Sequence, residues 1–301
     1  MMEKKLSVVI VTYKSEKDIY PCLQSLWQHC DIPKEELEII IVDNSPECEP
    51  MFTKLRQQHG SQLVLIHNTH NGGYGQGNNV GIRQATAPVI MIMNPDVRLT
   101  EPVFKTVLEE FNKNPALSMY GMKQMVSQEK ESTNSFCCTF MMNGYAATLL
   151  NAVCTRKDLY LPRYMYLQGS CFFIHREKFE QIGLYDEKVF MYGEEDDIHY
   201  RMTQRFGYHI AYNPQLHYIH LTGSRQPDIN YQKKRLAATV YFNEKKGYSW
   251  KKTVRNFKQT YQLLIAREYI RLKLHKGNAA HYHMAVDFYQ YLKNYHYSKE
   301  L

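Results

Sequence analysis

The feature that most constrains the fold of this chain is a repeated alternation of short apolar runs with segments of helical spacing. The apolar runs are rich in β-branched residues and lack the polar alternation of a strand with one solvated face. They read LSVVIVTY, LEIIIVDN, QLVLIHN and VIMIMN, at residues 6–13, 37–44, 62–68 and 89–94. Buried strands joined by helices predict an α/β fold with a doubly wound, mainly parallel sheet.

The remaining elements follow from periodicity, Gly and Pro. Helical spacing is expected over residues 15–30, 48–59, 78–87 and 101–114, and short helices over 176–183 and 196–207. Further strands are expected over 165–176 and 209–220, while 137–150 has no clear period and is expected to be irregular or helical. From residue 231 the pattern is mostly helical, with breaks near Gly247 and Gly277.

Composition restricts the class of protein further. With 301 residues, 44% hydrophobic and 22% charged, the chain is expected to be globular, and a disordered or fibrous chain is excluded. No apolar run approaches the roughly 18 residues of a membrane span, and the apolar start is expected to be the first strand instead of a signal peptide. Seven scattered cysteines without a Cys-x-x-Cys pair are typical of reduced thiols and predict a cytoplasmic protein.

Charge is distributed unevenly along the chain. Residues 231–301 hold 15 Lys and Arg against 4 Asp and Glu, a net charge of +11, whereas residues 1–230 are mildly acidic. Aromatic residues alternate with these cations, as in YSWKKTVRNFKQTYQLL at 248–264. This mixture predicts peripheral contact with the anionic inner face of the cytoplasmic membrane. The alternative is a helical hairpin that packs its aromatics on the catalytic body; no nucleic-acid partner is expected, because no recognised module is present.

Polar side chains stand where the predicted strands end. In a doubly wound sheet, ligands bind beyond the carboxyl ends of the strands. Pro95 cannot donate to a strand ladder, so the fourth strand ends there and a carboxylate is held at the rim. That carboxylate suits a cation or a ribose, although Asn-Pro-Asp is also good turn chemistry. The residues at these ends are Thr12, Tyr13, Asp43, Asn44, Asn94 and Asp96.

A glycine-rich segment, NGGYGQGNNVG, occupies residues 71–81. Its glycines permit positive φ and close approach of the backbone to a ligand, and its amides open a helix. A dinucleotide-binding fingerprint is the rival interpretation, but the third glycine comes one residue early and the loop follows the third strand. No Gly-Lys-Ser/Thr follows, which excludes a P-loop. The candidate ligand-binding residues are Asn71, Gly73, Asn78 and Asn79.

Two further groups could carry chemistry. Four consecutive acids precede a predicted helix at 194–197, and although some suit a helix start, crowding raises carboxylate pKa values toward those of a general base. His220 ends a strand-like run before a Thr-Gly-Ser loop at 222–224, a position that suits a ligand to a metal or diphosphate.

In order and spacing, these motifs resemble glycosyltransferase family 2, the inverting enzymes of GT-A fold, and within it a bacterial rhamnosyltransferase-like branch. The resemblance covers roughly residues 6–225 and includes SVVIVTY, VDNS, MNPDV, QGSCFFIHR and GLYDEKVFMYGEEDDIHYR. It implies that Asp96 ligates Mg²⁺ or Mn²⁺, that Asn94 lies near the ribose, and that Thr12, Tyr13 and Asp43 hold the nucleotide. The branch has Gly-Glu-Asp-Val-Asp before its helix, so the base is Glu195 by register or Asp196 by residue type.

The expected function is therefore transfer of a sugar from a dTDP- or UDP-linked donor to a hydroxyl of a bacterial surface polysaccharide or lipid-linked glycan. A non-catalytic nucleotide-sugar-binding or scaffold protein of the same fold is the main alternative, and an NAD-dependent dehydrogenase is disfavoured by the glycine spacing. The expected organisation is a GT-A domain over 1–230, with a nucleotide-sugar half (1–119) and an acceptor half (120–230), followed by a helical extension over 231–301.

Overall fold

The computed structural model describes residues 3–132, 135–221 and 227–297, and they form two compact units. Unit 1 comprises Met1–Phe136, Leu167–Phe190 and Ile198–Thr222. Unit 2 comprises Cys137–Tyr166, Met191–Asp197 and Gly223–Leu301. Unit 2 therefore draws on two internal segments as well as the C-terminal one, which differs from the contiguous division expected at residue 230.

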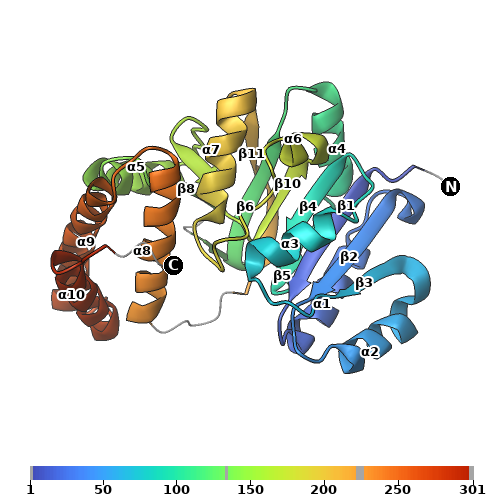
Figure 1. The fold of residues 1–301 in the computed structure, drawn as a ribbon, viewed down its shortest axis with the longest axis horizontal. Helices are drawn as coiled ribbons and strands as arrows, with labels where there is room; N and C mark the ends of the chain where they lie inside the picture. Colours follow the sequence, from blue (N-terminus) through green and yellow to red (C-terminus); the bar gives the residue numbers. More distant parts are fainter. Residues whose placement is uncertain (1–2, 133–134, 222–226, 298–301) are drawn as a thin grey trace. The chain divides into compact units, whose positions relative to one another are not determined.

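Unit 1 is built on a mixed sheet with the strand order β3-β2-β1-β4-β10-β6-β11-β5, and β7 pairs with β6 beside this path (Figure 1). Its strands are β1 (Leu6–Thr12), β2 (Leu37–Asp43), β3 (Leu63–His67), β4 (Val89–Met93), β5 (Val97–Leu99), β6 (Met119–Ser127), β7 (Lys130–Glu131), β10 (Cys171–His175) and β11 (Ile210–His220). A separate two-stranded sheet consists of β8 (Phe136–Cys138) and β9 (Met165–Leu167).

Most helices lie close to the ranges expected from periodicity, but the helix expected over 78–87 starts at Tyr74 and ends at Ile82, so Asn78 and Asn79 lie inside it and not at its start. The helices are α1 (Glu16–Gln28), α2 (Glu49–His59), α3 (Tyr74–Ile82), α4 (Phe104–Lys113), α5 (Gly144–Arg156), α6 (Arg176–Gln181), α7 (Glu194–Phe206), α8 (Ile229–Lys245), α9 (Trp250–Lys273) and α10 (Ala279–Lys293). The segment without a clear period, 137–150, contains the end of β8 and the first half of α5. Strand β6 and the short strands β5 and β7 were not expected from the sequence.

Helices cover both faces of the sheet, as a doubly wound fold requires. Alternate β1 residues, among them Val8 and Ile10, join a core with buried side chains of α1, α2 and α4. On the opposite face, Gly81 of α3 packs against Val9 and Val42. The predicted fold class is confirmed.

Strand direction decides where polar side chains can meet. Strands β1, β2, β3 and β4 pair in parallel, and β6 and β11 pair in parallel with each other. Strand β10 lies antiparallel between β4 and β6, so β6 and β11 run in the same direction as β4. The carboxyl ends of β1, β2, β4 and β11 consequently lie along one edge of the sheet.

Unit 2 contains a helical core of its own. Helices α8, α9 and α10 bury Leu236, Val254, Phe257, Tyr261 and Phe288 against one another. Val254, Phe257 and Tyr261 of the 248–264 stretch thus face other helices. The membrane contact expected of residues 231–301 stays a prediction. No helix in the described ranges is long and apolar enough to cross a membrane.

Candidate active site

The end of β2 places Asp43 in a small hydrogen-bond network with β1. The Thr12 hydroxyl donates to Asp43 Oδ1 at 2.7 Å, and the Ser45 hydroxyl donates to the same oxygen at 3.0 Å. Asn44 N donates to Thr12 O at 2.8 Å, which ties the two strand ends together. These hydrogen bonds fix the orientation of the Asp43 carboxylate. Ser45 belongs to the VDNS motif but was not singled out from the sequence.

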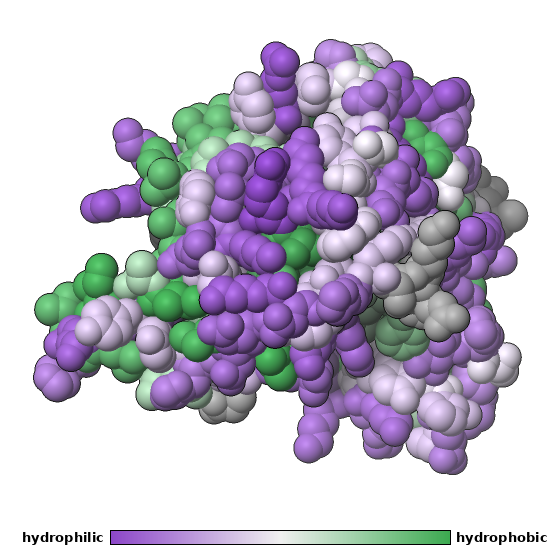
Figure 2. Space-filling view, turned by 60° about the vertical axis from the view of Figure 1, so that its left-hand side comes forward, coloured by the Kyte–Doolittle hydropathy of each residue, from purple (hydrophilic) through white to green (hydrophobic). Residues whose placement is uncertain are grey.

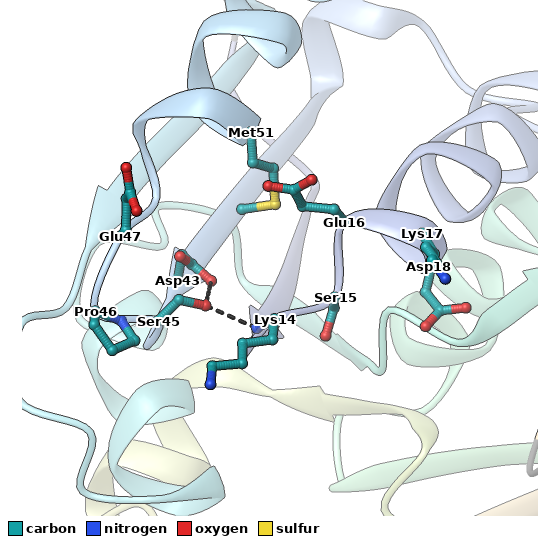
Figure 3. A pocket seen from close by; sticks show the side chains of 10 residues that line it. All are labelled: Lys14, Ser15, Glu16, Lys17, Asp18, Asp43, Ser45, Pro46, Glu47 and Met51. Atoms are coloured by element: carbon teal, nitrogen blue, oxygen red, sulfur yellow. Dashed lines mark hydrogen bonds between the residues drawn. The ribbon is translucent and has the colours of Figure 1, made fainter.

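A cavity of about 650 Å³ opens beside this network (Figure 3). Asp43 Oδ2 is buried and accepts no hydrogen bond from the protein. Because an unsatisfied buried carboxylate oxygen is costly, it is available to a donor group on a ligand, such as a ribose hydroxyl or a base N–H. The lining residues are Lys14, Ser15, Glu16, Lys17, Asp18, Asp43, Ser45, Pro46, Glu47 and Met51.

The turn after β1 forms one wall of the cavity. Lys14 adopts a left-handed backbone conformation, with φ of 52°, and its N–H donates to the Ser45 hydroxyl at 2.7 Å. Its ammonium lies 5.5 Å from the centroid of the exposed Tyr13 ring. Tyr13 therefore offers an exposed ring at this rim, and a side chain of this kind can stack on a flat ligand.

Pro95 ends β4 as expected and turns the chain directly into β5. Asn94 N donates to Ser170 O at 2.8 Å, and Val97 N donates back to Asn94 O at 3.1 Å. Leu221 N then donates to Asp96 O at 2.9 Å, which joins this turn to the end of β11. The Asn-Pro-Asp segment is thus a turn and, at the same time, a link between two strand ends.

This link brings Asp96 and His220 together. His220 Nε2 lies 3.3 Å from Asp96 Oδ1, and Nε2 is buried with no hydrogen-bond partner. A carboxylate oxygen and an imidazole nitrogen at this separation are suitable ligands for Mn²⁺, or for Mg²⁺ through the carboxylate. The Thr-Gly-Ser loop that was expected after His220 lies outside the described residues.

Two protein ligands fit a cation that is shared with a substrate. Within residues 3–132, 135–221 and 227–297, no three His, Cys, Asp or Glu side chains cluster in a way that could hold a metal alone. Mg²⁺ in phosphate-handling sites is commonly held by one or two carboxylates with the remaining positions taken by substrate phosphates and water. The pair of Asp96 and His220 matches that arrangement.

The glycine-rich segment serves helix packing in its central part. A Cβ on Gly73, whose φ is 94°, would lie 1.9 Å from Phe190 O, and one on Gly77 would lie 2.8 Å from the Asn44 amide and from Val11. Asn44 donates to Gly73 O at 3.3 Å, and Asn71 Oδ1 accepts from Gly73 N at 3.2 Å. These contacts hold α3 against the sheet, and ligand contact by these residues stays a prediction.

The two asparagines of α3 are also engaged with the protein. Asn79 Nδ2 donates to Tyr185 O and to Glu187 Oε1, and Asn79 Oδ1 accepts from Tyr185 N. Asn78 Nδ2 donates to Tyr74 O, one turn earlier in the same helix. These contacts support a structural role for Asn79, which fixes the segment around Tyr185, while its predicted role at a ligand is untested.

The acidic run forms the first turn of α7, within unit 2. Gly193, with φ of 86°, precedes this turn. Of the four acids, Glu195 is half-buried, whereas Glu194, Asp196 and Asp197 are buried. Burial, and then the neighbouring Glu195, raise the pKa of Glu194 to about 8. Glu194 Oε1 makes no hydrogen bond. The neutral carboxyl is the form such a site favours.

Asp196 has a different environment. Its Oδ2 accepts from the ammonium of Lys246 at 2.5 Å, and Lys246 Nζ also lies 3.3 Å from Asp196 O. Both side chains are almost entirely buried. A carboxylate paired in this way is neutralised by its partner and is poorly suited to take a proton from a substrate. Lys246 gave no sequence signal, because it lies 50 residues further along the chain.

The mainly parallel sheet with helices on both faces is the fold of GT-A glycosyltransferases. The chain belongs to the family described as glycosyl transferase family 2, whose model matches residues 7–183. That range includes Thr12, Asp43 and Asp96, whereas the acidic turn of α7 and His220 lie beyond it.

Curated relatives agree with this family. The chain is 29% identical over 204 residues to the low-salt glycan biosynthesis hexosyltransferase Agl10 of Haloferax volcanii, which covers 65% of this chain and 61% of Agl10. It is 30% identical over 103 residues to the poly(ribitol-phosphate) beta-N-acetylglucosaminyltransferase TarS of Staphylococcus aureus, covering 34% of this chain and 18% of TarS. The chain thus spans less than two thirds of the length of these relatives.

Solved structures share the fold over nearly the whole chain. A mannosyltransferase from Pyrobaculum calidifontis, in complex with GDP-Man and Mn²⁺, matches with a TM-score of 0.60 at 15% identity, covering 97% of this chain and 88% of that one. TarS residues 1–349 of S. aureus, in complex with UDP, match with a TM-score of 0.54 at 14% identity, covering 98% and 93%. At this level of identity the likeness shows the fold.

Proposed function

We propose that this protein transfers a sugar from a nucleotide-diphosphate sugar, dTDP- or UDP-linked, to a hydroxyl group of a growing glycan, with inversion at the anomeric carbon. The observation that carries this proposal is the approach of His220 Nε2 to Asp96 Oδ1, 3.3 Å apart, on the sheet edge where Asp43 faces a cavity. A nucleotide-diphosphate sugar needs both features, since the cavity beside Asp43 would hold the nucleoside and the pair of Asp96 and His220 would hold the cation that binds the diphosphate.

In this proposal, Asp43 accepts a hydrogen bond from the nucleoside through its unsatisfied Oδ2, and Thr12 and Ser45 keep the carboxylate oriented. Asp96 and His220 hold Mg²⁺ or Mn²⁺, which when bound neutralises charge on the diphosphate leaving group. Tyr13 covers the base. Each of these side chains comes from unit 1.

Glu195 takes the proton of the acceptor hydroxyl. The hydroxyl oxygen forms a bond to the anomeric carbon while the bond from that carbon to the diphosphate oxygen breaks, and the nucleoside diphosphate leaves. Glu195 is favoured over Asp196 because Asp196 is buried against Lys246, whereas Glu195 is half-buried. The register of the resemblance supports the same residue.

Two relatives support a role in making glycans: the low-salt glycan biosynthesis hexosyltransferase Agl10 and the O-antigen biosynthesis protein RfbC of Myxococcus xanthus. The dehydrogenase alternative has no support from the family. A scaffold that binds the donor without transferring it remains the alternative to be separated by experiment.

A donor panel tests the proposal. The chain is incubated with Mn²⁺ and dTDP-rhamnose, UDP-galactose, UDP-glucose or UDP-N-acetyl sugars, with GDP-mannose and NAD as controls, and nucleoside diphosphate release is measured. Release from a dTDP- or UDP-sugar that stops with EDTA and returns with Mn²⁺ is expected. Thermal stabilisation by these nucleotides without turnover, across a broad acceptor panel, would indicate the scaffold, and stabilisation by NAD alone would contradict the proposal.

A further inference from the structure

The last turns of α9 expose an unusual group of apolar side chains within unit 2. Tyr269, Ile270 and Leu274 are 50%, 57% and 59% exposed, although unit 2 has a well-formed helical core to receive such residues. Figure 2 shows apolar side chains at the surface directly beside strongly hydrophilic ones. Large apolar side chains that gather at one surface site mark an interaction surface more often than scattered ones do.

These side chains lie on one face of the helix. At about 100° per residue, Tyr269, Ile270 and Leu274 fall within an arc of about 140°, and Lys273 falls between them. The Lys273 ammonium lies 5.6 Å from the centroid of the Tyr269 ring, which is consistent with that placement. The opposite side of the helix is the buried one, because Glu268 and Tyr261 are both buried there.

The same segment has no exposed carboxylate. Glu268 is the only acidic residue between Lys245 and Asp287, and it is buried and ion-paired with Arg267 at 2.8 Å. Lys273 and Lys276 are exposed in this segment, whereas Arg271 lies on the side of Glu268, with its Nε 3.9 Å from Glu268 Oε2. The end of α9 and the loop after it therefore present apolar and cationic groups together, without a competing negative charge.

We propose that Tyr269, Ile270, Lys273 and Leu274 form a lipid-docking face that binds an anionic membrane surface. Cationic side chains contact lipid phosphates, and Ile and Leu enter the boundary between headgroups and acyl chains. A nucleic acid would leave the aliphatic side chains in water, and a second copy of this face would bring like charges together. The face lies within the 231–301 region for which membrane contact is expected from the sequence, C-terminal to the 248–264 stretch.

The test is co-sedimentation of the full chain with vesicles, without any sugar donor, so its outcome is independent of the proposed transferase activity. Vesicles of phosphatidylcholine with about 30% phosphatidylglycerol are compared with pure phosphatidylcholine, at low and high salt. Binding to the anionic vesicles at low salt, weakened at high salt, is expected. Absence of binding to anionic vesicles at low salt overturns the proposal.

Two double variants separate the apolar and cationic contributions. Ile270→Ser with Leu274→Ser is expected to lower the partition coefficient by roughly 10- to 100-fold, and Lys273→Gln with Lys276→Gln by roughly 10- to 30-fold. The matched control is Leu149→Ser with Val153→Ser on α5, two apolar side chains that are 62% and 54% exposed and belong to the same unit.

The control is expected to bind like the parent chain, with the melting temperature of every variant within a few degrees of it. An equal loss in the control, or unchanged binding in both variants of α9, overturns the assignment to this face. Tighter binding to an RNA oligonucleotide than to vesicles, unaffected by the Ile270 and Leu274 substitutions, overturns the choice of a lipid partner.

Discussion

At the carboxyl edge of the sheet in unit 1, Asp43 and Asp96 stand at the ends of separate strands, whereas in unit 2 four acidic residues follow one another in the first turn of α7. The edge residues are supported by neutral or basic neighbours, namely the hydroxyls of Thr12 and Ser45 and the imidazole of His220. Spacing along a sheet edge gives each carboxylate its own hydrogen-bonding neighbours.

In the acidic turn, the neighbouring carboxylates repel one another, and each has a different local environment. The raised pKa of Glu194 favours its neutral form, Asp196 is neutralised by Lys246, and Glu195 keeps partial contact with solvent. The comparison teaches that a run of four acids does not provide four equivalent candidates for a base. On this basis we propose Glu195 for proton transfer.

Removing Asp96 is expected to have the largest effect on the unit 1 side of this comparison. Asp96→Ala should lower transfer by about 10⁴-fold or more and abolish Mn²⁺-dependent nucleotide binding, because charge on the leaving group is no longer neutralised. Nucleotide affinity with and without Mn²⁺ is measured by titration calorimetry. Glu109→Ala, at a half-exposed position on α4, is the control and should behave as the parent chain. If a folded Asp96→Ala protein retains Mn²⁺-dependent nucleotide affinity, Asp96 is not a metal ligand and only forms the turn after β4.

Glu195→Gln tests the base in unit 2. The substitution keeps the shape but removes the proton acceptor, so turnover should fall by about 10² to 10⁴ with donor affinity nearly unchanged. Asp196→Asn should lower turnover much less per folded molecule. Steady-state rates and donor affinities of both variants decide between them, and the reverse ranking with preserved donor affinity would identify Asp196 as the base.

The buried pair between α7 and the end of α8 predicts a change in stability. Lys246→Met leaves Asp196 charged and buried without its partner, which should lower the free energy of unfolding by about 3 to 5 kcal/mol. The double variant Asp196→Leu with Lys246→Met removes both charges and should recover most of that loss. Urea unfolding of the single and double variants gives the comparison. A double variant as unstable as the single one would show that the pair is not coupled as described.

Glu194 predicts a smaller, pH-dependent effect. The pKa of Glu194 in the folded protein is about 8, above the usual 4.5. Between pH 4.5 and pH 8, the Glu194 carboxyl is therefore protonated in the native state and ionised in the unfolded state. Its contribution to stability therefore declines as pH rises from about 4.5 to 8. Glu194→Gln should match the parent near pH 4.5 and be more stable than the parent above pH 8. Parallel curves of melting temperature against pH would contradict the raised pKa.

Much of unit 1 could be predicted from the sequence, because its strands are apolar runs whose ends coincide with polar residues. The predicted runs over 37–44 and 89–94 became β2 and β4, and their carboxyl ends meet at one edge as parallel pairing requires. The antiparallel insertion of β10 and the pairing of β5 with β11 could not be predicted, since both depend on contacts between distant segments.

The candidate site divides in the same way. Asp96 and His220 were each placed at a strand end by local pattern, but only the pairing of β5 with β11 brings them within 3.3 Å. Asn79 illustrates a different case, because its position in a glycine-rich segment predicts ligand contact, and only the structure shows that its amide also holds Tyr185. The local sequence pattern identifies polar residues that could contact a ligand. Tertiary contacts decide which of these side chains are hydrogen-bonded within the protein.

We propose that unit 1 residues at the sheet edge bind the cation and the donor, and that Glu195 in the first turn of α7 takes the proton. The most direct test follows the free Mn²⁺ signal by electron paramagnetic resonance while protein is added with UDP or dTDP. The parent chain and Glu195→Gln should both deplete the signal in the presence of nucleotide, and Asp96→Ala and His220→Ala should not. Depletion that survives in Asp96→Ala and His220→Ala, or is lost in Glu195→Gln, would contradict this proposal.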